Sequence, residues 1–312
     1  MKTTKIFRIS LLLVAILIAG LTACRKDKTT TISDPGVNSV QNLAADENQV
    51  NSASDEAIND VNVVLGLKGG MTPAFGLPCH AIIDSTAIAN DSITYYVTYH
   101  GTNCRGNLSR TGQVEIKKHI RTHWYEAGAS VIYKYINFHV THIASQKSIT
   151  LNGKKTYTNV SGGLIFMIPQ YITSVIQKDE GYMNVTFDDG STRSWQVARQ
   201  LTFTRPDSDF VVTIDGYGSA DNYNNLVIWG INRNSEQFYI QILQSVVQRE
   251  ACQYDPCSGQ KKISIPDKNK GATLTFGYDS NDQPITGNDC PTKYKVDWYK
   301  GNNSGTMYLW LP

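Results

Sequence analysis

Residues 93–100 read Ile-Thr-Tyr-Tyr-Val-Thr-Tyr-His, and in this stretch large apolar side chains alternate with mostly polar ones. An alternation with a period of two places one set of side chains on each face of a β-strand. The same alternation recurs after about residue 79, in the runs 132–140, 195–203 and 238–242. We therefore predict that the folded part of the protein is built from half-buried strands.

Turn-forming pairs separate these runs. Asn152-Gly153 and Asp215-Gly216 favour tight hairpins, because these residue types accept a positive φ angle. About fifteen short strand patterns follow residue 66, and no amphipathic helix is found among them. Parallel sheets need crossover helices, so we predict an all-β, antiparallel fold, either a sandwich or an extended twisted meander. This β domain spans residues 79–312, as one domain or as two subdomains that divide near residue 205.

Two other segments precede the β domain. Residues 24–51 are rich in Thr, Ser, Asn, Asp and Gln and have few large apolar side chains, which predicts a flexible tether. Residues 52–66 predict one short helix, because apolar side chains recur there at helical spacing. Ser52 and Asp55 resemble a capping box at its start, and Gly66 is suited to its end.

The first 23 residues have the pattern of a secretory signal peptide: a basic start, an apolar run at 9–20, and small residues before a cleavage site. The sequence Leu21-Thr22-Ala23-Cys24 ends this segment and resembles the lipobox of bacterial lipoproteins. In that family the cysteine carries a diacylglycerol and becomes the first residue. The resemblance implies that Cys24 is lipidated and that its acyl chains anchor the protein. No Asp follows Cys24, which by analogy favours the outer membrane, facing the periplasm or the cell surface.

Composition and charge exclude several classes of protein. A hydrophobic content of 41% is too high for a wholly disordered chain. The signal peptide holds three of the 29 basic residues and no acidic ones, so its removal leaves 26 basic against 27 acidic residues. A near-neutral chain without a basic block is a poor nucleic-acid binder. The predicted partner is the membrane, through the lipid anchor, and a glycan or another envelope protein is a further candidate.

The cysteines after Cys24 predict disulfides, because an exported protein meets an oxidising compartment. Cys79 and Cys104 flank two adjacent strand patterns, and their bond would close a loop worth about 3 kcal/mol. Cys290 pairs with either Cys252 or Cys257, and we prefer Cys252. The spacing between Cys252 and Cys257 is longer than in the usual zinc knuckle, so a structural metal is not predicted there.

Three histidines are weak candidates for a metal site. His119 and His123 share one face of a strand or helix, and a hairpin in a suitable register would add His139 to that face. A slip of one residue in the register destroys the arrangement. The competing interpretation is a solvated strand face, and we predict neither a metal nor another cofactor.

Strand and turn segments over residues 79–300 resemble a group of β-rich outer-envelope lipoproteins from Bacteroidota-type bacteria. They include the strand 93–104 that ends at Cys104, the turn Arg110-Thr111-Gly112, the run 230–234, and Cys252 followed later by Cys290. The resemblance implies a β architecture and a lipoprotein, and it implies no particular activity.

No motif for catalysis is found: the sequence has no Gly-x-Ser-x-Gly elbow and no P-loop. The leading hypothesis is a non-catalytic, lipid-anchored β module of the envelope with a structural or ligand-binding role. One alternative is a glycan-capturing or carbohydrate-active surface protein, which a cleft with close acids and exposed aromatic side chains would favour. Another is a lipid-handling periplasmic protein, which an apolar groove would favour.

Overall fold

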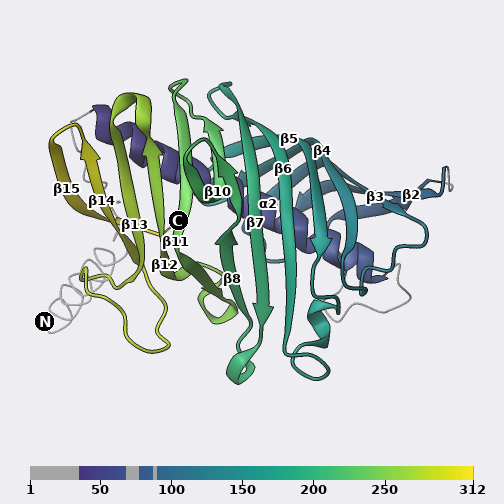
Figure 1. Cartoon of the computed structure of the whole chain (residues 1–312). Helices are drawn as coiled ribbons and strands as arrows, with labels where there is room; N and C mark the ends of the chain where they lie inside the picture. The colour runs from purple at the N-terminus through teal and green to yellow at the C-terminus, as the bar shows by residue number, and fades with distance from the viewer. Residues whose placement is uncertain (1–34, 68–76, 87–89, 312) are drawn as a thin grey trace, which may run out of the picture. The chain divides into compact units, whose positions relative to one another are not determined.

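The computed structural model describes residues 35–67, 77–86 and 90–311 (Figure 1). The predicted signal peptide at 1–23, the lipidation candidate Cys24 and the first part of the predicted tether lie outside these residues.

Strands make up most of the described chain. The first eight are β1 (Ala81–Ser85), β2 (Ser92–Thr102), β3 (Leu108–His119), β4 (Ala129–His142), β5 (Ser148–Asn159), β6 (Ser174–Phe187), β7 (Thr192–Thr204) and β8 (Val211–Gly216). The next seven are β9 (Gly218–Ala220), β10 (Tyr223–Ile231), β11 (Gln237–Arg249), β12 (Pro256–Ile265), β13 (Lys270–Tyr278), β14 (Lys293–Lys300) and β15 (Asn303–Trp310). Short 3-10 turns join some of them: η1 (Ile165–Met167), η2 (Pro206–Ser208), η3 (Glu250–Cys252) and η4 (Pro266–Lys268).

The described strands form one 15-stranded sheet in which neighbours follow chain order from β1 to β7 and from β10 to β15. β8 pairs with β7 and β11, and β9 pairs with β10. Every pairing is antiparallel, for example β2 with β3 and β6 with β7. The predicted antiparallel all-β fold is confirmed, and its form is the extended meander. The sheet continues across residue 205, because β7 on one side of it pairs with β8 and β10 on the other.

One long helix, α2 (Pro35–Leu67), lies along one face of the sheet (Figure 1). It has 33 residues and is longer than the helix predicted at 52–66. Residues 35–51, predicted as part of the tether, are therefore helical. The described α2 is too polar to meet the requirements for a membrane-spanning helix.

The early part of α2 is helical because its few apolar residues fall at helical spacing and pack on the sheet. Val40, Leu43, Ala44 and Val50 are all buried. Most helix stability in proteins comes from such packing of one face and not from intrinsic propensity. Composition alone indicates a tether here, because strands that contact α2, such as β13 and β14, lie more than 200 residues further along the chain.

β5 and β6 each contain a glycine with an unusual backbone angle. Gly153 and Gly181 have φ angles of 145° and 144°, which side chains rarely adopt. A Cβ atom on Gly181 would lie 2.4 Å from the backbone oxygen of Lys154, on the neighbouring strand. Gly181 pairs with Lys155 across β5 and β6, and Lys155 belongs to the buried charges described below.

Candidate functional site

Acid–base pairs hold α2 on the sheet. The helix carries five acidic residues and no basic one, and its partners on the sheet and its loops are basic. The ion pairs are Asp46–Arg233, Glu47–Lys261, Asp55–Arg199, Glu56–Arg110 and Asp60–Arg110. Because these pairs are largely buried, removing one partner would leave an uncompensated charge in the interior.

Asp179 of β6 is the centre of the most deeply buried of these charge clusters. Its carboxylate accepts hydrogen bonds from Lys155 Nζ at 2.9 Å, Arg199 Nη2 at 3.2 Å and Tyr133 Oη at 2.7 Å. Burial alone would raise the pKa of Asp179, but Lys155 and Arg199 outweigh it and hold this pKa below its ordinary value. Burial also lowers the pKa of Lys155, although Asp179 opposes that effect. The cluster is therefore an ionised network inside the protein.

Ser54 of α2 joins this network in an arrangement that resembles a Ser–Lys catalytic pair. Its Oγ accepts a hydrogen bond from Lys155 Nζ at 2.9 Å and lies 3.0 Å from Tyr135 Oη. The three side chains are fully buried, and the ammonium of Lys155 is already bonded to Asp179. These hydrogen bonds connect Ser54 of α2 to strands β4 and β5, so the arrangement holds the helix on the sheet.

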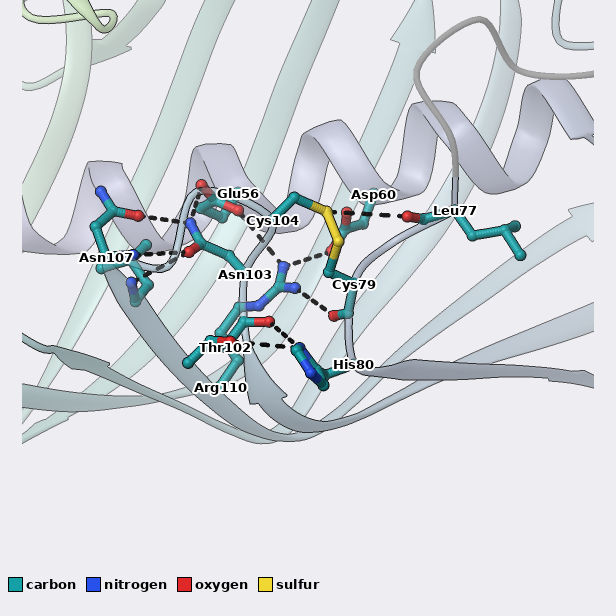
Figure 2. The surroundings of a disulfide bond; sticks show 11 residues. Glu56, Asp60, Leu77, Cys79, His80, Thr102, Asn103, Cys104, Asn107 and Arg110 are labelled. Carbon is teal, nitrogen blue, oxygen red and sulfur yellow. Dashed lines mark hydrogen bonds and ion pairs between the residues drawn. A yellow bond between two sulfur atoms is a disulfide. The ribbon is translucent and has the colours of Figure 1, made fainter.

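Arg110 of β3 joins the sheet to the second half of α2 (Figure 2). Its Nη1 donates to Asp60 at 2.8 Å and to Glu56 at 3.4 Å, and its Nη2 donates to the backbone oxygen of Cys79 at 2.9 Å. Burial raises the pKa of Asp60 to about 6, although the guanidinium of Arg110 acts in the opposite direction. One buried arginine thus connects the helix, strand β3 and the segment that carries a disulfide.

A cavity of about 760 Å³ lies between α2 and the sheet, within the range of small-molecule sites. Its helix wall contains a polar stripe, and the part of its sheet wall that comes from β7, β8 and β11 contains an apolar patch. The stripe consists of Asn48, Ser52, Asp55 and Asn59, and the apolar wall consists of Leu201, Phe203, Val212, Ile214 and Val246. This cavity is the candidate functional site.

Two loops meet at the exposed side of the cavity, which we call the mouth. Arg105, between β2 and β3, lies over the ring of Tyr254, with its Cζ 5.0 Å from the ring centroid. Arg205 and Glu250 also line this part of the cavity and are exposed. Burial raises the pKa of Asp255, next to Tyr254, to about 6. The mouth therefore combines arginines, an aromatic ring and a carboxyl group that titrates near neutral pH.

Both disulfides that the sequence favours are present, and they border this mouth. Cys79 is bonded to Cys104, which is next to Arg105 in the sequence. Cys252, two residues before Tyr254, is bonded to Cys290. Cys257 is a free, half-buried thiol, and burial raises its pKa.

The structure does not bring the candidate metal ligands together. His139 of β4 pairs with Thr111, whereas His119 lies at the far end of β3, eight residues along the strand, or about 26 Å. The imidazole of His139 instead contacts the hydroxyl groups of Thr150 and Thr141, at 2.9 and 3.2 Å. No group of three His, Cys, Asp or Glu side chains within the described residues could hold a metal ion. The register separates His119 from His139, and His123 lies beyond the end of β3, where its ring stacks on that of Tyr125, so the three-histidine site does not form.

The residues that build the cavity carry no local motif. The stripe at 48, 52, 55 and 59 has helical spacing, but polar residues at such spacing usually face water. Ser52 and Asn59 are exposed here too, and only the position of the sheet shows that the stripe also borders a cavity. Comparisons with protein-family models, curated proteins and solved structures find no match for this chain.

Proposed function

We propose that the protein is a lipid-anchored protein of the bacterial outer envelope that binds a small ligand and does not transform it. Support for the anchor comes from the lipobox-like sequence ending in Cys24 and from the resemblance to β-rich Bacteroidota-type lipoproteins. The two disulfides agree with an oxidising compartment outside the cytoplasm.

The anchor is tested by replacing its thiol. We expect Cys24→Ser to abolish incorporation of labelled palmitate and to leave the signal peptide uncleaved, because both steps require this thiol. Cys257→Ser is the matched control, since it removes the other cysteine that forms no predicted disulfide, and it should be labelled like the wild type. Labelling of the Cys24→Ser chain would refute the anchor.

The cavity beneath α2 is the observation that supports ligand binding. Its size suits a small molecule, and it joins an apolar wall to a limited number of polar groups. The ion pairs and disulfides around it fix both walls before a ligand arrives, which lowers the entropic cost of binding.

A substitution that fills the cavity tests this site. Ser52 is exposed at the edge of the cavity, so Ser52→Trp places an indole in the space without disturbing the packed core. We expect the fluorescent apolar probe N-phenylnaphthylamine to bind the full chain in lipid nanodiscs, after subtraction of the signal from empty nanodiscs. Its affinity should fall by about tenfold or more in Ser52→Trp, because the indole occupies volume that the probe needs.

Asn42→Trp is the control for this experiment. Asn42 is exposed on the same helix and does not line the cavity, so this variant should bind the probe like the wild type. Equal probe affinity in the wild type and both variants would place binding elsewhere and would remove the support for a ligand site here.

A glycan-capturing or carbohydrate-active protein is a second candidate function. The observation that favours it is the pair Tyr254 and Asp255 at the mouth, where an aromatic ring adjoins a carboxyl group with a raised pKa. Glycosidases use a carboxyl group of this kind as a general acid. Hydrolysis of a glycoside by the full chain, lost in Asp255→Asn, would favour this candidate over simple ligand binding.

A further inference from the structure

The polar stripe on α2 has hydrogen-bonding groups to spare. Within the part of the chain that the structure describes, the side chains of Asn48, Ser52 and Asn59 form no hydrogen bond with another residue, whereas Asp55 is paired with Arg199. The three unpaired groups lie four and seven residues apart, which corresponds to about 6 and 10 Å along the helix axis. A ligand in the cavity therefore meets a row of amide and hydroxyl groups and not a single polar anchor.

Part of the opposite wall is apolar, although Arg110, Gln248 and Lys261 of the sheet also line the cavity. Leu201 and Phe203 of β7, Val212 and Ile214 of β8, and Val246 of β11 turn apolar side chains to the cavity, and all five residues are buried. β8 pairs with both β7 and β11, so these side chains form a continuous apolar surface. This surface faces α2 across the cavity.

The two walls place opposite demands on a ligand. A molecule with one polar end and a plain hydrocarbon chain would cover the amide groups of the stripe with hydrocarbon, and leaving such groups unpaired is costly. A purely polar molecule, such as a free sugar, would leave the apolar wall in contact with water. Both demands are met when the polar groups lie along one side of an elongated apolar body.

We propose that the cavity binds a facial amphiphile: a neutral or anionic molecule with hydroxyl or amide groups along one side and hydrocarbon along the other. The proposal rests on the ligand-binding function proposed above and specifies its ligand class. The hydroxyl groups contact the stripe of Asn48, Ser52 and Asn59, and the hydrocarbon packs on β7, β8 and β11. Arg105 at the mouth is placed to meet an acidic group at the end of the ligand.

A pair of steroid acids tests the ligand class. Cholate carries three hydroxyl groups on one side of its ring system, and cholanate has the same rings and carboxylate without them. We expect isothermal titration of the full chain in nanodiscs, corrected for empty nanodiscs, to show that cholate binds about tenfold more tightly than cholanate. Asn59→Leu should weaken cholate binding by about tenfold and leave cholanate binding unchanged or stronger.

Asn42→Leu is the matched control, because it makes the same change on the same helix outside the cavity. Equal affinity for cholate and cholanate, or cholate binding that Asn59→Leu does not alter, would overturn the ligand class. If Ser52→Trp still blocks N-phenylnaphthylamine in that case, the ligand site remains and only the class is wrong. If neither steroid acid nor the probe binds, the proposed function fails together with the inference.

Discussion

Asp179→Asn is expected to lower the free energy of unfolding by about 3–5 kcal/mol, the usual cost of removing one partner from a buried ion pair. The carboxylate of Asp179 is the acceptor for Lys155, Arg199 and Tyr133, and its side chain is fully buried. An asparagine of the same shape keeps the packing but leaves two cations with less negative charge around them. Urea denaturation at neutral pH, followed by tryptophan fluorescence, measures the loss.

Asp297→Asn is the control for this prediction. Asp297 pairs with Lys295 at 2.9 Å, but its side chain is 40% exposed, so the same substitution should cost less than about 1 kcal/mol. The double variant Asp179→Asn with Lys155→Met should be more stable than Asp179→Asn alone, because it also removes one of the stranded cations. Equal losses at positions 179 and 297 would contradict the central role of this network.

Arg110→Met is expected to destabilise the fold by about 3–5 kcal/mol at neutral pH, and by less in acid. Arg110 is the partner of both Asp60 and Glu56 on α2, and its guanidinium also binds the backbone oxygen of Cys79. Without it, two carboxylates next to the cavity lose their counter-charge. Keeping these carboxylates ionised inside the protein then lowers the free energy of unfolding.

The pH dependence follows from Asp60. Its pKa in the folded protein, about 6, lies above the ordinary value for aspartate, so the folded state binds more protons than the unfolded state in the interval between them. Stability linked to Asp60 is therefore present in acid and is lost as the pH rises through about 6. Removing Arg110 raises this pKa further and steepens the loss towards neutral pH.

Denaturation of Arg110→Met at about pH 5 and about pH 7.5 measures this difference directly. Arg105→Met is the control, because Arg105 is exposed and lies five residues away in the same part of the chain. It should change stability little at either pH. An equal loss for Arg110→Met at both values would show that the variant acts through lost packing and not through the charge of Asp60.

Local patterns in the sequence predicted the strand structure well. The alternation at 93–100 corresponds to β2, but both pairs expected to form hairpin turns, Asn152-Gly153 and Asp215-Gly216, lie inside strands, β5 and β8. In β5, Gly153 has a φ angle of 145° and the pairing with β6 continues past it. A glycine in the sequence indicates that the backbone can adopt a positive φ angle there. Whether that residue lies in a turn or within a strand depends on the pairing with neighbouring strands.

Features that depend on neighbouring residues can be predicted from the sequence: the period-two strands, the antiparallel order expected without crossover helices, and the cysteines suited to pairing. The tertiary structure decided the rest, because the contacts are distant in sequence. Glu47 and Lys261 are 214 residues apart in the sequence. Asp46 and Arg233 are 187 residues apart. No local pattern records that these charges meet, that residues 35–51 are helical as a result of packing on the sheet, or that the polar stripe of α2 faces an apolar wall across a cavity.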